Sequence, residues 1–154
     1  MELKIIWLLT LVSYSFIVSQ SLMYIIALRN VQLNMDAPSY TSFRKLLDKN
    51  FRNKFRFPFY STFITNSVLV TLCSTKPFSL GFITSVVGWV AFAENTLFML
   101  KGNLPVNKAI NDWTPDTVPP DWVSYRDLWL SVFMKRQVCD IVGFLSLLIG
   151  VVFG

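Results

Sequence analysis

Residues 5–28 read IIWLLTLVSYSFIVSQSLMYIIAL, a run of 24 residues without a charged side chain. About 20 apolar residues are enough for an α-helix to cross the hydrocarbon core of a bilayer. The block is too long for the hydrophobic part of a signal peptide, and its end, Ala27-Leu28-Arg29-Asn30, has no small-x-small cleavage site. The stretch therefore predicts a retained first membrane-spanning helix.

Three further apolar blocks follow, and they occupy residues 58–75, 79–100 and 138–153. Only a turn at Lys76-Pro77 separates the first two of these, which predicts a helical hairpin. The last block is the shortest, and it fits the end of a longer helix that begins near Pro120, because proline suits a first turn. The sequence thus predicts a single domain over residues 1–154, an all-α, integral membrane four-helix bundle with cytoplasmic helical extensions.

The composition of the 154 residues points the same way. Hydrophobic residues make up 53% and charged residues only 15%, whereas soluble domains usually carry about 25% charged residues. The net charge of +5 comes from basic residues that flank the apolar blocks, so lipid headgroups explain it better than nucleic acid. The chain has no histidine, so no imidazole is present to bind a metal or act as a base. No cofactor is expected.

The segment between the first and second predicted spans, residues 29–57, is basic and amphipathic. Its apolar residues recur at helical spacing, at Tyr40, Phe43, Leu47 and Phe51. This pattern predicts a helix that begins near Pro38 and either lies on the headgroups or extends the next span into water. Residues 101–119 contain Gly102 and three prolines, which predicts a loop.

The distribution of lysine and arginine predicts the topology. Residues 29–57 hold seven of them and residues 101–137 hold five, whereas the opposite side has only Lys4 and Lys76. Positive residues accumulate in cytoplasmic loops. We therefore expect a multi-pass protein of the plasma (inner) membrane, with its long connections in the cytoplasm and both termini outside. Cys73 and Cys139 would then lie near opposite faces, too far apart for a disulfide.

Polar side chains within the predicted spans are costly and need an explanation. There are five of them, namely Gln20, Asn66, Glu94, Asn95 and Asp140. At about 1.5 Å per residue, all five fall within roughly 12 Å of the cytoplasmic end of their span. Four helices would thus place polar groups in one layer, which is a candidate ligand-binding or catalytic site. In the alternative interpretation they hold helices together, with Glu94 paired to Arg126 or Arg136.

Small residues predict how the third and fourth spans pack. Gly81 and Gly88 lie on one face of the third span, and Gly143 and Gly150 lie on one face of the fourth. Small residues let helix backbones approach closely. Antiparallel pairing would bring Gly81 level with Gly150 and Gly88 level with Gly143.

The stretch 102–107, GNLPVN, is followed by Pro119-Pro120-Asp121-Trp122 and by well-spaced tryptophans and arginines. This pattern resembles the anthrone-oxygenase-like family of small four-span membrane proteins, most of which are known only as a domain of unknown function. The resemblance covers nearly the whole chain. The motif residues are Asn103, Pro105, Asn107, Trp113, Asp121, Trp122, Arg126, Trp129 and Arg136.

The resemblance implies a helical bundle and, in the characterised members, cofactor-independent oxidation of a polycyclic anthrone to a quinone. Many relatives carry a histidine where this chain has Phe133. The motif also has a structural interpretation, in which Asn103 and Asn107 cap the third helix or satisfy loop carbonyls and the tryptophans anchor the segment at the membrane interface.

Two functions follow from the sequence. Because the histidine is absent, the first is a non-catalytic membrane protein, either an accessory subunit or a binder of a hydrophobic molecule. The alternative is a cofactor-independent, anthrone-type oxygenase that acts on an aromatic ligand within the bundle. The expected partners are membrane lipid and either other membrane subunits or a hydrophobic small molecule.

Overall fold

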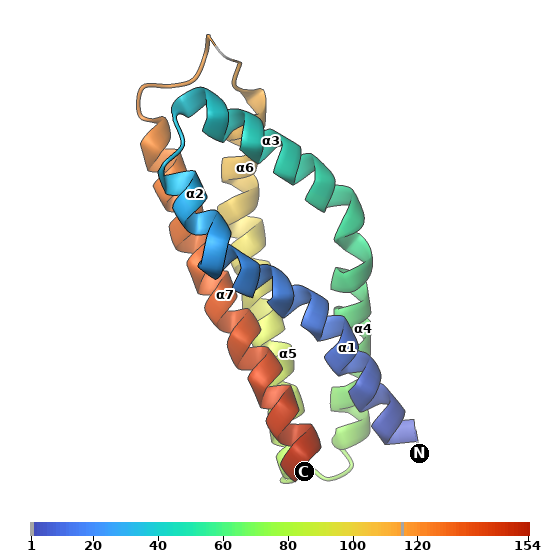
Figure 1. Ribbon diagram of the computed structural model, residues 1–154. Coiled ribbons are helices and arrows are strands. Elements are labelled where there is room, and N and C mark those ends of the chain that lie inside the picture. The colour runs from blue at the N-terminus through green and yellow to red at the C-terminus, as the bar shows by residue number, and fades with distance from the viewer. Residues whose placement is uncertain (1, 115) are drawn as a thin grey trace.

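The computed structural model describes residues 2–114 and 116–154, and within these residues it contains helices and no β-strand. In the first half, α1 (Glu2–Met23) continues through a π-helical turn, η1 (Tyr24–Leu28), into α2 (Arg29–Leu33), and is followed by α3 (Ala37–Lys54) and α4 (Arg56–Cys73) (Figure 1). The second half consists of α5 (Leu80–Phe98), the π-helical turn η2 (Met99–Asn103), α6 (Leu104–Asp112) and α7 (Trp122–Phe153).

Three continuous helical segments are long and apolar enough to cross a membrane, and they are Glu2–Leu33, Leu80–Asp112 and Trp122–Phe153. They contain the first, third and fourth predicted spans. The second predicted span forms α4, which is not among the three, since Asn66 and many hydroxyl residues lower its hydropathy. Four of these hydroxyls donate to the carbonyl four residues earlier at 2.7–2.9 Å, from Thr62, Thr65, Ser67 and Thr71.

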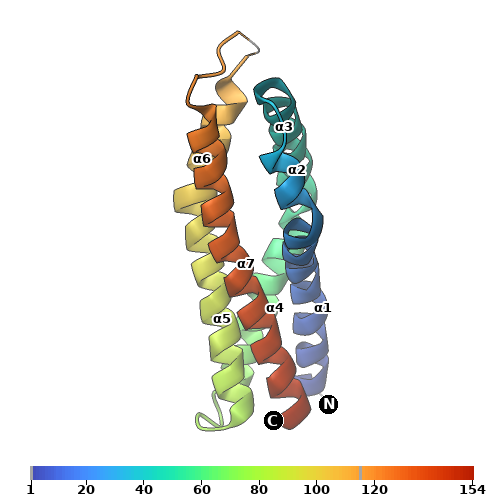
Figure 2. The same cartoon turned by 60° about the vertical axis from the view of Figure 1, so that its left-hand side comes forward.

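The helices are arranged in two layers. One layer holds α1, α3 and α4, and the other holds α5, α6 and α7 (Figures 1 and 2). The contact between α5 and α7 is the most extensive, and α1 packs against both α4 and α7. Both termini lie at the same end of the molecule as the turn from α4 to α5, whereas the turn from α2 to α3 and the start of α7 lie at the other end.

The predicted amphipathic helix is confirmed as α3. It begins where expected, since the Asp36 carboxylate accepts a hydrogen bond from the backbone N–H of Ser39 at 3.0 Å and Pro38 lies in the first turn. The predicted tight turn after α4 is also present. The Ser79 hydroxyl accepts a hydrogen bond from the backbone N–H of Phe82 at 3.2 Å and so caps α5.

The predicted loop at 101–119 is wrong over its first half, because the helix continues through η2 and α6 to Asp112. Pro105 lies in the first turn of α6, and the wider π-helical turn before it relaxes the hydrogen-bond pattern that a proline would otherwise break. Gly102 allows α7 to pack closely against this turn. A Cβ at this position would lie 2.5 Å from Cγ1 of Val132 on α7.

The predicted pairing of glycines between the third and fourth spans is also wrong, by about one helical turn. Gly88 faces the Leu147 side chain, and Gly150 faces Thr84 rather than Gly81. Gly88, Gly143 and Gly150 thus accommodate larger side chains of other helices, whereas Gly81 lies beside Gly154. Close packing requires a small residue on one side of the contact only.

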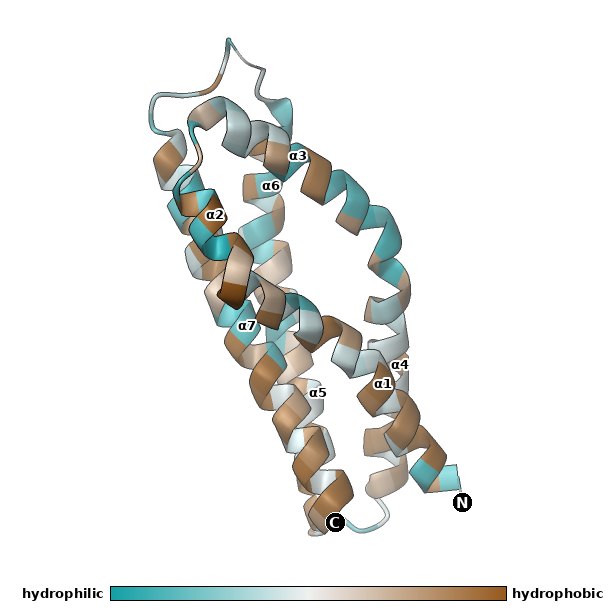
Figure 3. Ribbon diagram, viewed as in Figure 1, coloured by the Kyte–Doolittle hydropathy of each residue, from teal (hydrophilic) through white to brown (hydrophobic). Residues whose placement is uncertain are grey.

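Two clusters of buried apolar residues stabilise the ends of the molecule. The cluster near the termini contains Tyr14, Leu69 and Leu147, and the cluster at the far end contains Tyr40, Ile110 and Trp129. Hydrophobic residues predominate along α1 and α7, whereas α3 carries many hydrophilic residues (Figure 3). Many of the hydrophobic residues on α1 and α7 are exposed. Both cysteines are free, as expected.

Candidate functional site

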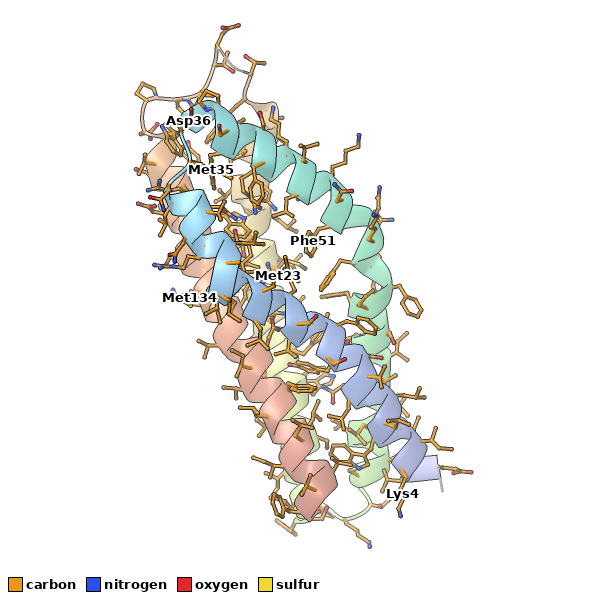
Figure 4. The ribbon with its side chains drawn as sticks, in the orientation of Figure 1. Lys4, Met23, Met35, Asp36, Phe51 and Met134 are labelled. Atoms are coloured by element: carbon orange, nitrogen blue, oxygen red, sulfur yellow. The ribbon has the colours of Figure 1, made fainter. Side chains whose placement is uncertain are left out.

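A cavity of about 770 Å³ lies between the two layers, bounded by α1, η1, α3, the start of α4, η2, α6 and α7. This volume is within the roughly 300–1,000 Å³ of typical small-molecule sites. Figure 4 shows Met23 and Phe51 on opposite sides of the opening between α1 and α3. Much of the wall is apolar, with contributions from Phe16, Met23, Leu47, Phe51, Phe59 and Met99.

Three buried aromatic side chains form one wall of the cavity. The rings of Trp129 and Phe133 on α7 stack with their centroids 4.7 Å apart and 16° between their planes. Tyr24 of η1 packs against both, with centroid distances of 5.4 Å to Trp129 and 4.4 Å to Phe133. The Gln32 amide donates a hydrogen bond to the Tyr24 hydroxyl. The wall is therefore an aromatic surface that is fixed from two helical segments, although Tyr24 is tilted by 41° and 54° to the other two rings.

Asn107 of α6 connects three helices beside this wall. Its Oδ1 accepts hydrogen bonds from Nη2 of Arg44 and from Nε1 of Trp129, both at 2.8 Å. Its Nδ2 donates to Oδ1 of Asp48 at 3.1 Å. A single amide thus satisfies two donors and one acceptor, which fixes α3 and α7 against α6.

Arg136 of α7 forms a second polar group on the cavity wall. Its Nε donates to Oδ1 of Asn95 at 2.7 Å, and its Nη1 donates to Oδ1 of Asn103 at 3.1 Å. Nδ2 of Asn103 in turn donates to the Trp129 carbonyl at 3.0 Å. Both partners of the guanidinium are neutral amides, so its positive charge is oriented but not neutralised.

Arg44 is the most deeply buried cation of the site, with 3% of its surface exposed. Its guanidinium carbon lies 3.7 Å from the centroid of the Trp129 ring, a close cation–π contact. Its Nε has no hydrogen-bond partner among the described residues. Burial lowers the pKa of Arg44, and the neighbouring Tyr24, Tyr40 and Asp48 oppose this effect, so the guanidinium keeps its proton.

Tyr40 lies next to Arg44 in the buried face of α3. Its side chain is fully buried, and its hydroxyl has no partner among the described residues. Burial raises the pKa of Tyr40 to about 12, although Arg44 and Arg126 act in the opposite direction. The hydroxyl is therefore neutral near pH 7 and does not balance the charge of Arg44.

The five residues of the predicted polar layer are brought together only in part. Gln20 lines the same cavity as Arg136, and Asn95 is buried and bonded to that arginine. Asp140 accepts a hydrogen bond from the Ser21 hydroxyl at 2.7 Å, while its other oxygen has no partner among the described residues. Asn66 is fully buried in α4, and neither atom of its amide has a partner among these residues.

Glu94 does not take part in this layer. Its side chain is exposed on the outer face of α5, and the predicted ion pair with Arg126 or Arg136 is wrong. Arg126 instead donates to Asp127 at 2.9 Å and to the Leu33 carbonyl at 3.1 Å. Neighbouring residues of an α-helix point about 100° apart, so Asn95 occupies the inner face and Glu94 cannot.

The residues on which the family resemblance rests are divided between two places. Asn103, Asn107, Trp129 and Arg136 all line the cavity, and the two asparagines lie within continuous helix, where they do not cap α5. The other motif residues lie on α6, directly after it, or near the start of α7, and they are Pro105, Trp113, Asp121, Trp122 and Arg126.

These remaining residues have structural contacts. Trp122 packs against Tyr40 with centroids 5.5 Å apart, and the Arg126 guanidinium lies 5.4 Å from the Trp122 ring. Trp113 is buried, and its carbonyl accepts a hydrogen bond from Lys45. Asp121 is exposed just before α7 and makes no capping hydrogen bond with its side chain. This half of the motif ties α7 and the end of α6 to α2 and α3.

Comparisons of the chain with protein-family models, with curated proteins and with solved structures found no match. Its function is therefore inferred from the geometry of its own residues.

Proposed function

We propose that the chain is an integral membrane protein that crosses the bilayer four times and holds a hydrophobic molecule in the cavity without catalysing its conversion. The cavity is the observation that carries this proposal. It is large enough for a small molecule, its wall is mostly apolar, and a few polar groups converge on one side of it. A role as an accessory subunit requires no such cavity, so ligand binding is the better supported of the two non-catalytic roles.

The four-span arrangement is supported by the placement of α4. This helix of 18 residues runs beside α1 and α5, and its hydroxyls are bonded back to its own carbonyls, which lowers the cost of placing them in lipid. The positions of the termini fit four crossings, because both lie at the end of the molecule that holds the Lys76 turn (Figure 1). The basic α3 and the start of α7 would then face the cytoplasm.

Cysteine labelling in intact cells tests this topology. In a variant whose two native cysteines are replaced, we expect a cysteine at position 76 to react with a membrane-impermeant reagent from outside. Cysteines at positions 49 and 108 should react only after the membrane is made permeable, since the basic connections stay in the cytoplasm. Labelling of positions 49 and 76 from the same side would contradict the four-span arrangement.

Filling the cavity should weaken ligand binding. Leu47 lines the cavity, whereas its neighbour Leu46 is 63% exposed and does not. We expect Leu47→Trp in non-ionic detergent to bind the neutral fluorescent probe phenylnaphthylamine roughly tenfold more weakly, because overpacking costs about 1–3 kcal/mol. Leu46→Trp is the matched control and should bind it like the wild type. Equal affinities for all three proteins would refute binding in this cavity.

The aromatic wall specifically favours the second candidate function, an anthrone-type oxygenase. Tyr24, Trp129 and Phe133 present flat rings beside Arg136, as binding of a polycyclic aromatic molecule would require. In that reaction O₂ oxidises a ring methylene to a carbonyl, and its second oxygen atom leaves as water with the two hydrogens. Spectroscopic measurement of quinone formation from anthrone in air decides between the two functions. A rate above the spontaneous reaction that disappears in Arg136→Gln would establish the oxygenase.

A further inference from the structure

The side chains that line the cavity carry an excess of positive charge. Asp48 is the only carboxylate among the described lining residues, so five cations against one anion leave a net charge of +4. The Asp48 oxygens are already engaged by Asn107, Asn111 and Arg52. The five cations are Arg44, Arg52, Lys54, Arg56 and Arg136.

The two inner cations, Arg44 and Arg136, have no carboxylate partner. Among the described residues no acidic oxygen lies within 4.0 Å of either guanidinium, and the hydrogen bonds of both are made to asparagine amides. Asp140 lies one turn from Arg136 on the same helix, but its bonded oxygen accepts from Ser21. Arg44 is buried and Arg136 is half-buried, and Asp48 and Asp140 act on them only through space, without contact. A buried charge without a contacting counter-charge is costly. Two cations in this situation beside one cavity indicate that the occupant supplies negative charge at the guanidinium groups.

The remainder of the cavity defines the other part of this occupant. The rings of Trp129, Phe133 and Tyr24 and the apolar side chains of α1 and α3 offer no partner for a second charged group. Guanidinium groups bind carboxylates and phosphates through paired hydrogen bonds. The three outer cations are exposed where α3 meets α4, and they are Arg52, Lys54 and Arg56. At this place they would attract an anion toward the opening of the cavity.

We propose that the cavity binds an anionic amphiphile, with its oxyacid head group on Arg44 and Arg136 and its hydrophobic body between the aromatic wall and the side chains of α1 and α3. This inference rests on the proposed ligand-binding function and adds the charge of the ligand to it. The same chemistry is offered by an anionic lipid of the bilayer and by a water-soluble acid with an aromatic body.

A pair of fluorescent probes tests the head group. Anilinonaphthalene sulfonate and phenylnaphthylamine share their rings, and only the first carries a negative charge. With the full-length protein in non-ionic detergent, we expect the sulfonate to bind about tenfold more tightly, a difference of about 1.4 kcal/mol. Arg44→Gln and Arg136→Gln should each remove this preference, because each takes away one of the two cations that would hold the sulfonate. Lys49→Gln, which removes a cation outside the cavity on α3, should leave the preference intact.

Two further variants keep the test decisive if an arginine-to-glutamine variant fails to fold. Arg44→Lys and Arg136→Lys retain the positive charge, so both should still prefer the sulfonate. Circular dichroism and thermal unfolding confirm that each variant compared is folded.

Mass spectrometry of lipids that co-purify then distinguishes the source of the ligand. Enrichment of anionic lipid in the wild type over Arg44→Gln and Arg136→Gln indicates a bilayer lipid, whereas sulfonate binding without such enrichment indicates a soluble acid.

The outcomes separate this inference from the function on which it rests. If both probes bind equally well to the wild type and to every folded arginine variant, the anionic head group is refuted and hydrophobic binding stands. If neither probe binds and no lipid co-purifies, the proposed binding function itself fails.

Discussion

Gly143→Leu is expected to prevent stable folding of the chain. A Cβ at this position would lie 2.8 Å from Cζ of Tyr14 and 3.1 Å from Cβ of Ala91. Tyr14 is fully buried in the cluster near the termini, so its ring has no free space into which to move. Overpacking typically costs about 1–3 kcal/mol, and we expect the upper end of this range or more. The measurements are folded yield and thermal unfolding in non-ionic detergent.

Two variants on α5 provide the comparison for this effect. Gly88→Leu should be destabilising as well, since its Cβ would lie 2.9 Å from Cγ of the buried Leu147. Val87→Leu places a leucine on the neighbouring residue, which is 40% exposed, and should unfold like the wild type. A Gly143→Leu protein that is as stable as Val87→Leu would mean that α1, α5 and α7 do not pack as described.

The helices could largely be predicted from the sequence, because uninterrupted apolar blocks such as residues 5–28 have few alternatives to a helix. The residues at which the helices end were harder to predict. The signals of Gly102 and Pro105 predicted a loop, yet the chain is helical as far as Asp112, and Gly102 packs closely against Val132. Local propensity is weak compared with tertiary contacts, and no local signal marks a π-helical turn that accommodates a proline.

The candidate site was predictable only in part, because hydropathy locates residues along a span but not around it. Asn95 and Glu94 are adjacent in the sequence, and only Asn95 faces Arg136. Arg44 was missed, although one signal was present. It follows Tyr40 by four residues and precedes Asp48 by four, so it shares one face of α3 with both. Charged residues on the face of a helix that also carries its apolar residues are a better indicator of a buried site than depth alone.

Asn107→Leu is expected to produce the second large effect, because it removes the residue that connects α3, α6 and α7. The guanidinium of Arg44 and the indole N–H of Trp129 would both lose their acceptor at 2.8 Å. Each buried donor left without a partner costs about 1–3 kcal/mol, so the two together cost roughly 2–6 kcal/mol. We expect a large fall in the unfolding temperature in detergent.

Two substitutions distinguish the loss of these hydrogen bonds from a general sensitivity of the region. Asn107→Asp keeps the shape of the side chain and the acceptor for Arg44 and Trp129, but it replaces the donor to Asp48 at 3.1 Å with a second carboxylate oxygen. It should therefore be destabilising, though less than leucine. Asn111→Ala removes a single hydrogen bond, the one its amide donates to Asp48 at 2.9 Å, and should cost about 0.5–1.5 kcal/mol. The network centred on Asn107 would be refuted by equal unfolding temperatures for Asn107→Leu and Asn111→Ala. In that case the hydrogen bond from Arg44 to Asn107 would not be the contact that orients the guanidinium toward the cavity.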